Sequence, residues 1–235
     1  MENENLVCIN VPEAKSGRDP HTWEEIAKEA TNKRASRIAV EFDQGFKFIK
    51  KFKRSVTFYG SARFKSNNPH YIQARTLGQR LAKEGFAVVT GGGPGIMEAG
   101  NRGAKEVGGQ SVGLNIRLPH EQIINKFVTE SMNFFYFFSR KTALSFAAEA
   151  YVFFPGGFGT LDEFFELITL IQTKKIGKAP VILFGKDYWE PLNEFIKTVV
   201  LEQHGAIDKK DLGLYVITDD YEEVVRIAKK APVRR

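Results

Sequence analysis

One stretch of the sequence places a strand, a glycine-rich turn and a carboxylate in a spacing that suits chemistry on a phosphate ester. It runs Tyr151-Val-Phe-Phe-Pro-Gly-Gly-Phe-Gly-Thr-Leu-Asp-Glu163, and its first four residues are apolar, as in a buried strand. An amphipathic segment then extends from Thr160 to about Thr173, which predicts a helix. A glycine turn that leads into a helix N-terminus presents free backbone N–H groups and the positive end of the helix dipole. The segment therefore predicts an anion site, with Glu163 one helical turn away from it.

Two other predicted strands also end in small residues. Gly60-Ser61-Ala62 follows the strand predicted over 55–59, and Gly91-Gly92-Gly93-Pro94-Gly95 follows the strand predicted over 86–90. In a parallel sheet, ligands bind beyond the carboxyl ends of the strands, so we expect the three turns to border one site. The first turn lacks the Gly-x-Gly-x-x-Gly spacing of dinucleotide-binding proteins, the second strand does not end in an acid, and there is no Gly-Lys-Ser/Thr phosphate loop. The pattern favours a mononucleotide.

The remaining sequence supplies the elements that must position these turns. From residue 55 onward, short hydrophobic strands alternate with helices of ten or more residues, which implies parallel pairing through right-handed crossovers. The predicted fold class is α/β, a Rossmann-like, doubly wound, mainly parallel sheet with helices on both faces. Residues 1–54 are predicted to form an N-terminal extension, irregular and then helical, and residues 55–235 a Rossmann-like nucleotide-binding catalytic domain. The predicted strands are 55–59, 86–90, 111–116, 127–130, 151–154, 180–184 and 214–217, and the predicted helices are 71–84, 96–107, 135–149, 160–173, 189–202 and 221–230.

Composition narrows the class of protein. The 235 residues are 43% hydrophobic and 26% charged, as in an ordinary globular protein. The single cysteine, Cys8, excludes a disulfide framework and a multi-cysteine metal site and favours a reducing compartment. No run of about 18 apolar residues is present and the first residues do not form a signal peptide, so we expect a cytoplasmic protein with no membrane partner.

The net charge of +6 is modest, and part of it lies in basic residues between 47 and 54. Such a cluster can bind nucleic acid or can simply be a solvated helix end. No stacking-aromatic motif or DNA-reading module accompanies it, so we expect no nucleic-acid partner. The four histidines are scattered without ligand spacing, and no metal is expected.

Three motifs together resemble one known family. Gly91-Gly92-Gly93-Pro94-Gly95-Ile96-Met97-Glu98, then Arg140-Lys141, then Pro155-Gly-Gly-Phe-Gly-Thr-Leu-Asp-Glu163 are similar in order and spacing to motifs of the Lonely Guy (LOG) family. The resemblance covers about residues 55–230. It implies a Rossmann-like homodimer that cleaves the N-glycosidic bond of cytokinin nucleotides and of nucleoside 5′-monophosphates such as AMP, releasing the free base and ribose 5-phosphate. It implies no metal and no organic cofactor. Members are often labelled lysine decarboxylases, a name that the residues here do not support.

The chemistry assigns roles to the candidate residues. Breaking a ribosyl C–N bond builds positive charge on the sugar, which requires a nearby carboxylate, and the 5′-phosphate requires N–H or cationic donors. Glu163 fits the first role by its position, and the resemblance implies that Arg140 assists catalysis or grips the substrate. The candidate substrate-binding residues are the turn residues and two companions from the family motifs: Ser61, Gly92, Gly93, Gly95, Glu98, Lys141, Gly156, Gly157, Phe158, Gly159 and Thr160.

Several of these residues could instead have a purely structural role. Thr160-Leu-Asp-Glu163 is also a capping box, in which Glu163 would only bond back to the Thr160 amide. Glu166 is either a second acid of the site or a solvated helix residue. The aromatic run 134–138 is expected to cover all faces of a helix and to pack in a core or a dimer interface, leaving one ring as a wall for a purine.

Three function classes remain for the whole chain. We expect a cytoplasmic, homodimeric nucleoside 5′-monophosphate N-glycosidase whose substrate is AMP or an N6-modified AMP. The alternative is a non-catalytic nucleotide or molybdenum-cofactor carrier on the same fold, which need not keep both Arg140 and Glu163. A pyridoxal-phosphate decarboxylase would instead require a lysine that forms a Schiff base.

Overall fold

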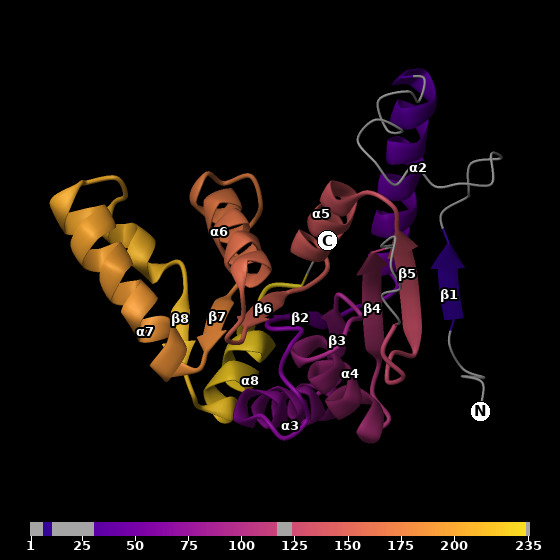
Figure 1. The fold of residues 1–235 in the computed structure, drawn as a ribbon, viewed down its shortest axis with the longest axis horizontal. Coiled ribbons are helices and arrows are strands. Elements are labelled where there is room, and N and C mark those ends of the chain that lie inside the picture. Colours follow the sequence, from indigo (N-terminus) through magenta and orange to yellow (C-terminus); the bar gives the residue numbers. More distant parts are fainter. Residues whose placement is uncertain (1–6, 11–30, 117–123, 234–235) are drawn as a thin grey trace.

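The computed structural model of the chain describes residues 7–10, 31–116 and 124–233, which form a single parallel sheet covered by helices on both faces (Figure 1). The strands are β1 (Val7–Asn10), β2 (Ser55–Tyr59), β3 (Ala87–Thr90), β4 (Ser111–Ile116), β5 (Glu130–Phe134), β6 (Ala150–Phe153), β7 (Val181–Phe184) and β8 (Val216–Thr218). The helices are α2 (Thr31–Ile49), α3 (Pro69–Lys83), α4 (Ile96–Glu106), α5 (Phe137–Ser145), α6 (Phe158–Gln172), α7 (Lys186–Phe195) and α8 (Tyr221–Lys230), with a π-helical turn η1 (Ile196–Gln203) and a 3₁₀ turn η2 (Lys209–Gly213).

The strand order is β1-β5-β4-β3-β2-β6-β7-β8, and every neighbouring pair is parallel. After β2 the chain builds outward through β3, β4 and β5 on one side, and then returns to build β6, β7 and β8 on the other. The order therefore reverses between β2 and β6, which is where doubly wound sheets bind their ligands. The prediction of a Rossmann-like, doubly wound α/β fold is confirmed.

Two hydrophobic cores hold the helices to the sheet. Successive residues of a strand point to opposite faces, so Val56 and Phe58 of β2 enter one core while Tyr59 enters the other. Helices α3, α4 and α8 cover the first of these faces and α2, α5, α6 and α7 cover the second (Figure 1). The helix starts follow local chemistry where a polar cap is present: the Asn68 side chain accepts a hydrogen bond from the His70 N–H at 2.9 Å, with Pro69 as the first residue of α3.

The N-terminal extension contains a strand that the sequence analysis did not predict. β1 pairs with β5 in parallel register, with Val7 opposite Glu130, and so forms one edge of the sheet. Farther along, Phe48, Ile49 and Phe52, at and just beyond the end of α2, are buried in the second core. The division into a 1–54 extension and a 55–235 domain stays a prediction. Part of the predicted irregular stretch, residues 11–20, lies outside the described residues.

The aromatic run does not form one helix, so that expectation was wrong. Phe134 ends β5 and is buried, whereas Phe137 and Phe138 begin α5 and are 53% and 48% exposed. The chain changes from strand to helix inside the run, because β5 begins three residues later and ends four residues later than the predicted strand over 127–130, and its pairing with β4 extends as far as Phe134. Consequently α5 is shorter than the helix predicted over 135–149.

The described residues contain neither a helix suited to cross a membrane nor a cluster of side chains suited to bind a metal ion. None of the helices in that part of the chain has the length and apolar character needed to cross a bilayer. The same residues contain no group of three or more histidine, cysteine or carboxylate side chains placed to hold a metal ion.

Candidate active site

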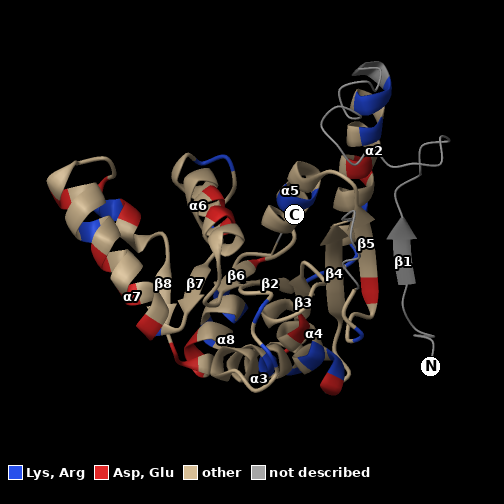
Figure 2. Cartoon of the chain, in the orientation of Figure 1, with Lys and Arg blue, Asp and Glu red and all other residues tan. Residues whose placement is uncertain are grey.

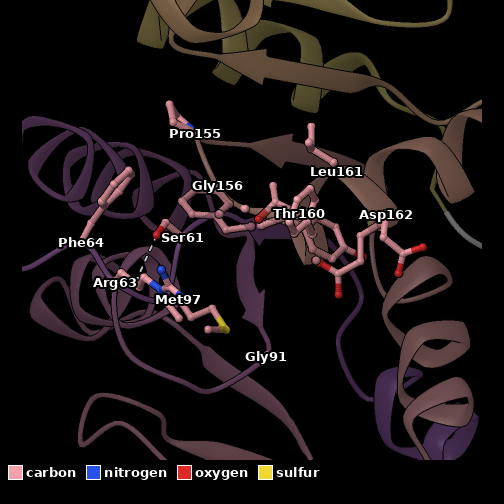
Figure 3. Close-up of a pocket in the computed structure, with 18 of the residues that line it drawn as sticks. Ser61, Arg63, Phe64, Gly91, Met97, Pro155, Gly156, Thr160, Leu161 and Asp162 are labelled. Atoms are coloured by element: carbon pink, nitrogen blue, oxygen red, sulfur yellow. Dashed lines mark hydrogen bonds between the residues drawn. The ribbon is translucent and has the colours of Figure 1, made fainter. Parts of the chain in front are cut away.

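A cavity of about 1000 Å³ lies beyond the carboxyl ends of β2, β3 and β6 (Figure 3). The three predicted turns do meet here. The Ser61 N–H donates to the Pro155 carbonyl at 3.0 Å, and the Ile96 N–H donates to the Ser61 carbonyl at 3.0 Å. The Ser61 hydroxyl in turn accepts from the Arg63 N–H at 3.1 Å, the bond drawn dashed in Figure 3. The turn after β2 is therefore hydrogen-bonded to the turns after both of its neighbouring strands.

Arg140 and Glu163, the two candidate catalytic residues, face each other in this cavity. Arg140 lies in the first turn of α5 and Glu163 in the second turn of α6, and Nη2 of Arg140 is 3.6 Å from Oε1 of Glu163. Their side chains are only 10% and 16% exposed. The structure thus brings together, from two separate helices, a cation and a carboxylate that the sequence separates by 23 positions.

The guanidinium of Arg140 is largely buried yet keeps hydrogen-bonding capacity. Its Nε is buried and has no hydrogen-bond partner among the residues that the structure describes. Its Cζ lies 5.0 Å from the centre of the Phe137 ring. A Cβ on Gly91 would lie 3.2 Å from Nη1 of Arg140 and 2.9 Å from Sδ of Met97, so the glycine makes room for the guanidinium. A buried arginine with an unused donor is suited to binding an anionic oxygen.

Burial controls the titration of Glu163. It raises the pKa of the Glu163 carboxyl from its ordinary 4.5 to about 7, although the positive charges of Arg140 and Lys141 oppose the rise. At 3.6 Å the Arg140 ion pair is too loose to offset the loss of hydration. Burial also lowers the pKa of Arg140, while Glu163 acts to raise it. A carboxyl group with a pKa near 7 can exchange a proton at neutral pH, as general acid–base catalysis requires.

The capping-box reading of Glu163 was wrong. Helix α6 begins at Phe158 with Gly157 as its N-cap, and no side chain caps it. Thr160 therefore lies inside the first turn, and Glu163 is too far along the helix to serve as the cap's reciprocal acid. The N–H groups of Phe158, Gly159 and Thr160 lie in the first turn, where no intrahelical carbonyl is available, and these residues border the cavity together with Gly156 and Gly157. The binding of an anion by these N–H groups stays a prediction.

The glycine-rich turn over 91–95, which follows β3, contributes less to the lining of the cavity than the sequence indicated. Gly91 lines it, but Gly92, Gly93 and Gly95 are not among the described residues that do. The Gly92 N–H donates to the Thr90 hydroxyl at 2.9 Å, and the carbonyls of Gly92 and Gly93 accept from the Asn125 side chain at 3.1 and 3.0 Å. Gly95 has φ +70°, and a Cβ there would lie 2.2 Å from the Ser61 carbonyl oxygen. These glycines shape the turn, and their contact with phosphate stays a prediction.

Glu98 and Lys141 also lie outside the cavity lining. Glu98 accepts a hydrogen bond from the Tyr71 hydroxyl at 2.8 Å, between α4 and α3. Lys141 contacts Asp162 at 2.6 Å and Glu166 at 3.1 Å, and so joins the basic stretch of α5 to the acidic stretch of α6 (Figure 2). Partial burial alone would lower the pKa of Lys141, but these two acids outweigh burial and raise it. The pair of contacts holds together the two helices that carry Arg140 and Glu163.

Sequence reasoning missed several residues of the cavity. Tyr59 ends β2 directly before the first turn, a position that could have indicated it. Burial, followed by the negative charge of Glu163, raises its pKa well above the ordinary value, so the hydroxyl stays protonated. The Tyr188 hydroxyl donates to the Gly156 carbonyl at 2.8 Å, a contact that only the tertiary structure reveals. Other side chains that line the cavity without a sequence signal are Phe64, His70, Met97, Leu144 and Asp187.

Comparison with known proteins shows which proteins the chain is similar to. Residues 97–228 match the model of a family described as "Possible lysine decarboxylase". The chain is 31% identical over 164 residues to the cytokinin riboside 5′-monophosphate phosphoribohydrolase LOG of Oryza sativa subsp. japonica, covering 68% of this chain and 66% of that protein. It is 32% identical over 181 residues to the cytokinin riboside 5′-monophosphate phosphoribohydrolase LOG7 of Arabidopsis thaliana. This match covers 75% of this chain and 81% of that protein. It is also 30% identical to the pyrimidine/purine nucleotide 5′-monophosphate nucleosidase of Escherichia coli K12, covering 70% of this chain and 38% of that protein.

Solved structures share the fold. The X-ray structure of TM1055 has a TM-score of 0.57 and 26% identity, covering 75% of this chain and 99% of that one. The molybdenum cofactor carrier protein of Chlamydomonas reinhardtii also has a TM-score of 0.57, and at 24% identity it shows the fold alone. The chain spans 62% of a second rice relative, LOGL5, to which it is 35% identical. From the matched family, the relatives and the shared motifs, we conclude that the chain belongs to the LOG family.

Proposed function

We propose that this protein is an N-glycosidase that hydrolyses nucleoside 5′-monophosphates, AMP or an N6-modified AMP such as a cytokinin nucleotide, to the free base and ribose 5-phosphate. The observation that carries the proposal is the buried Arg140–Glu163 pair in a cavity bordered by the free N–H groups of α6. The names of the relatives support it, because two are phosphoribohydrolases of cytokinin riboside 5′-monophosphate and one is a nucleotide 5′-monophosphate nucleosidase.

The geometry suits hydrolysis at the anomeric carbon. In the proposed reaction a water oxygen bonds to C1′ while the C1′–N bond breaks and its electron pair leaves with the base. Ionised Glu163 stabilises the positive charge that develops on the ribose and takes a proton from the water, and the base takes up a proton as it departs. The first turn of α6 binds the 5′-phosphate through its N–H groups. Arg140, which lines the cavity, holds an anionic oxygen through its guanidinium.

The cavity offers apolar surface for a base. Phe137 lines it beside Arg140, and Phe158, at the start of α6, is 93% exposed. An exposed aromatic ring at the edge of a binding cavity keeps apolar surface in contact with water. A purine that stacks on the ring would bury this surface, which is favourable. We therefore place the base of the nucleotide against one or both of these rings.

Decarboxylation through pyridoxal phosphate fits the cavity poorly. Among the described residues that line it there is no lysine to form a Schiff base, and the cationic side chains are those of Arg63 and Arg140. Lys141, the lysine nearest in sequence to the pair, is engaged by Asp162 and Glu166. The family's descriptive label therefore does not fit the chemistry of this site.

The turnover number kcat for AMP should rise with pH, reach half its maximum near pH 7 and level off above about pH 8. The ionised form of Glu163 is the active one, its pKa is about 7, and protonation below that value removes the charge that stabilises the sugar cation. Measuring kcat at saturating AMP from pH 5.5 to 8.5 keeps the ionisation of free substrate out of the profile. A flat profile would contradict the assignment, and a kcat that falls with rising pH would make protonated Glu163 the active form.

A substrate panel tests the proposed function. AMP, isopentenyl-AMP, CMP and adenosine are incubated with the protein and the free base is quantified by chromatography. We expect base from at least one monophosphate and about 100-fold less from adenosine, because a few charge-assisted hydrogen bonds to the phosphate are lost. Equal rates with AMP and adenosine would show that the phosphate is not the anchor. Tight AMP binding with no base released from any substrate would favour the carrier alternative.

We also propose that the protein is a cytoplasmic homodimer. The rings of Phe137, Phe138, Phe158 and Phe165, on α5 and α6, are exposed, and exposed large apolar side chains on neighbouring helices are typical of subunit interfaces. Light scattering of the purified protein should give twice the 26.5 kDa chain mass, and a monomer mass would overturn the assembly proposal.

A further inference from the structure

Glu41 is a fully buried acidic residue that lies on α2, outside the cavity and outside the mechanism above. Its Oε1 accepts a hydrogen bond from the Phe135 N–H at 2.5 Å, and its Oε2 accepts one from the Tyr136 N–H at 3.2 Å. Oε2 also accepts a hydrogen bond from the Ser139 hydroxyl. Both oxygens are therefore satisfied by a single short segment, the junction between β5 and α5.

This junction has no cap of its own. The N-cap residue of α5 is Tyr136, whose side chain makes no capping bond, and α5 has only nine residues. The first N–H groups of a helix need partners, and a carboxylate at that end is also favoured by the helix dipole. Glu41 places a carboxylate at this end from a different helix, and it accepts from the N–H groups of Phe135 and Tyr136, the two residues that lead into α5, and from the Ser139 hydroxyl in the first turn. The start of α5 is thus held by a residue of the N-terminal extension.

The packing of α2 fixes Glu41 in place. Gly45, one helical turn after Glu41, is buried, and a Cβ there would lie 3.1 Å from Cε1 of Phe134 and 3.7 Å from Cβ of Ala143. Phe48, one turn farther, is 1% exposed in the same core. These residues recur at the spacing of one helix face. Figure 1 shows this helix beside α5 and β5.

Ser139, whose hydroxyl donates to Glu41, lies in the turn of α5 that carries Arg140. The Arg140 N–H donates to the Tyr136 carbonyl at 3.2 Å, and Arg140 directly follows Ser139. The guanidinium itself has loose contacts, at 3.6 Å to Glu163 and 5.0 Å to the centre of the Phe137 ring. Few side-chain bonds hold the guanidinium, so its position depends on the backbone to which it is attached.

We propose that Glu41 is a positioning residue of the active site: by binding the two residues that lead into α5 and the Ser139 hydroxyl, it sets the placement of Arg140 relative to Glu163. The N-terminal extension is then part of the support of the catalytic pair. The kinetic consequence rests on the proposed N-glycosidase function, whereas the placement of Arg140 does not.

A double-mutant cycle tests the link between the two residues. Glu41→Gln removes the negative charge and puts an NH₂ group where the junction offers donors. We expect kcat for AMP to fall roughly 10- to 100-fold, as misplacement of a catalytic group by about 1 Å can do, with a smaller change in KM. In an Arg140→Ala background the same substitution should have no further effect on kcat. A loss that persists in that background would overturn the proposal.

Glu149→Gln is the matched control. Glu149 is 2% exposed, and it accepts hydrogen bonds from the Ser55 N–H at 2.6 Å and the Ser55 hydroxyl at 3.4 Å. Like Glu41 it is a buried acid bonded to a backbone N–H and a serine hydroxyl, but it lies at the opposite end of β2 from the cavity. Its replacement should lower the Tm of the protein without changing kcat. An equal loss of kcat in both variants would mean that Glu41 acts only on stability.

A second readout does not depend on activity. The Glu163 carboxyl is titrated by carbon-13 NMR in the wild type, Glu41→Gln, Arg140→Ala and Glu149→Gln proteins. Its charged neighbours are Arg140 and Lys141, which lower its pKa, and Asp162 and Glu166, which raise it. Moving or removing Arg140 should shift the midpoint upward in the first two variants and leave it unchanged in the third.

The two readouts separate failure of the proposal from failure of the proposed function. If the wild type releases no base from any monophosphate, the function is wrong, and the titration still decides the role of Glu41. A wild-type midpoint in folded Glu41→Gln protein would overturn the positioning role. If Glu41→Gln does not fold, Ser139→Ala replaces it, because this substitution removes only one of the three donors to Glu41. The midpoint of the Glu163 titration should then shift in the same direction by a smaller amount. An unchanged midpoint in Ser139→Ala would overturn the proposal.

Discussion

Glu163→Gln should reduce kcat for AMP by about 1000-fold while leaving the affinity for AMP nearly unchanged. Glutamine keeps the size and shape of the side chain but can neither carry the negative charge that stabilises an oxocarbenium-like sugar nor accept a proton from water. In the proposed complex, the phosphate is bound by other residues, those of the first turn of α6 and Arg140. The measurement is base release under saturating AMP, with AMP affinity determined separately by calorimetry.

The same substitution should stabilise the protein at alkaline pH. Burial raises the pKa of Glu163 from 4.5 to about 7, so the folded state binds a proton more tightly than the unfolded state, and ionisation above pH 7 favours unfolding. The difference of 2.5 pKa units corresponds to up to about 3 kcal/mol in the free energy of unfolding. Urea unfolding should therefore show Glu163→Gln to be more stable than the wild type at pH 8, with the gain shrinking as pH falls and vanishing near 4.5. A less stable variant at pH 8 would indicate that Glu163 has a structural role instead.

Arg140→Ala should lower kcat/KM for AMP by about 100- to 1000-fold, and Arg140→Lys should restore little of it. The arginine presents a planar fork whose Nη1 lies in a space that Gly91 leaves open, and a lysine would place a point charge there without that geometry. Loss of a buried charge-assisted donor in a site of low dielectric accounts for the size of the effect.

Arg54→Ala provides a control for the loss of an arginine. Arg54 lies 4.4 Å from the centre of the Phe86 ring and donates to the Lys229 carbonyl at 3.1 Å, at the end of β2 away from the cavity. Its replacement should leave kcat/KM unchanged. Full activity in Arg140→Ala, or full rescue by lysine, would contradict the role given to the guanidinium.

The meeting of the three turns could be predicted because it follows from local pattern and a general rule of sheet topology. Each turn comes after a short apolar strand, and parallel strands joined by right-handed crossovers bring their carboxyl ends to one edge of the sheet. Glu163 could be located in the same way, one turn into the helix after the glycines. What local pattern could not supply was the start of α6: its first residue, Phe158, is 93% exposed, so the apolar periodicity begins only after it.

The residues that support the site have no local signature. Glu41 is one of several charged residues on α2, and only the packing of α2 against α5 shows that it is buried at the first turn of that helix. β1 is a four-residue strand followed by a stretch that gives no strand or helix pattern, so its pairing with β5 depends on long-range contacts. The prediction that the aromatic run 134–138 lies in one helix was wrong because the composition of the run does not mark where the chain changes from strand to helix.

The most direct test of the account is the identity of the products formed from AMP by the wild-type protein, measured by chromatography beside Glu163→Gln. The account predicts adenine and ribose 5-phosphate in equal amounts from the wild type and almost none from the variant. Adenosine and inorganic phosphate would place the broken bond at the phosphate ester and contradict it. AMP that is bound but recovered intact from both proteins would contradict it as well, and would make this site one that holds a nucleotide without cleaving it.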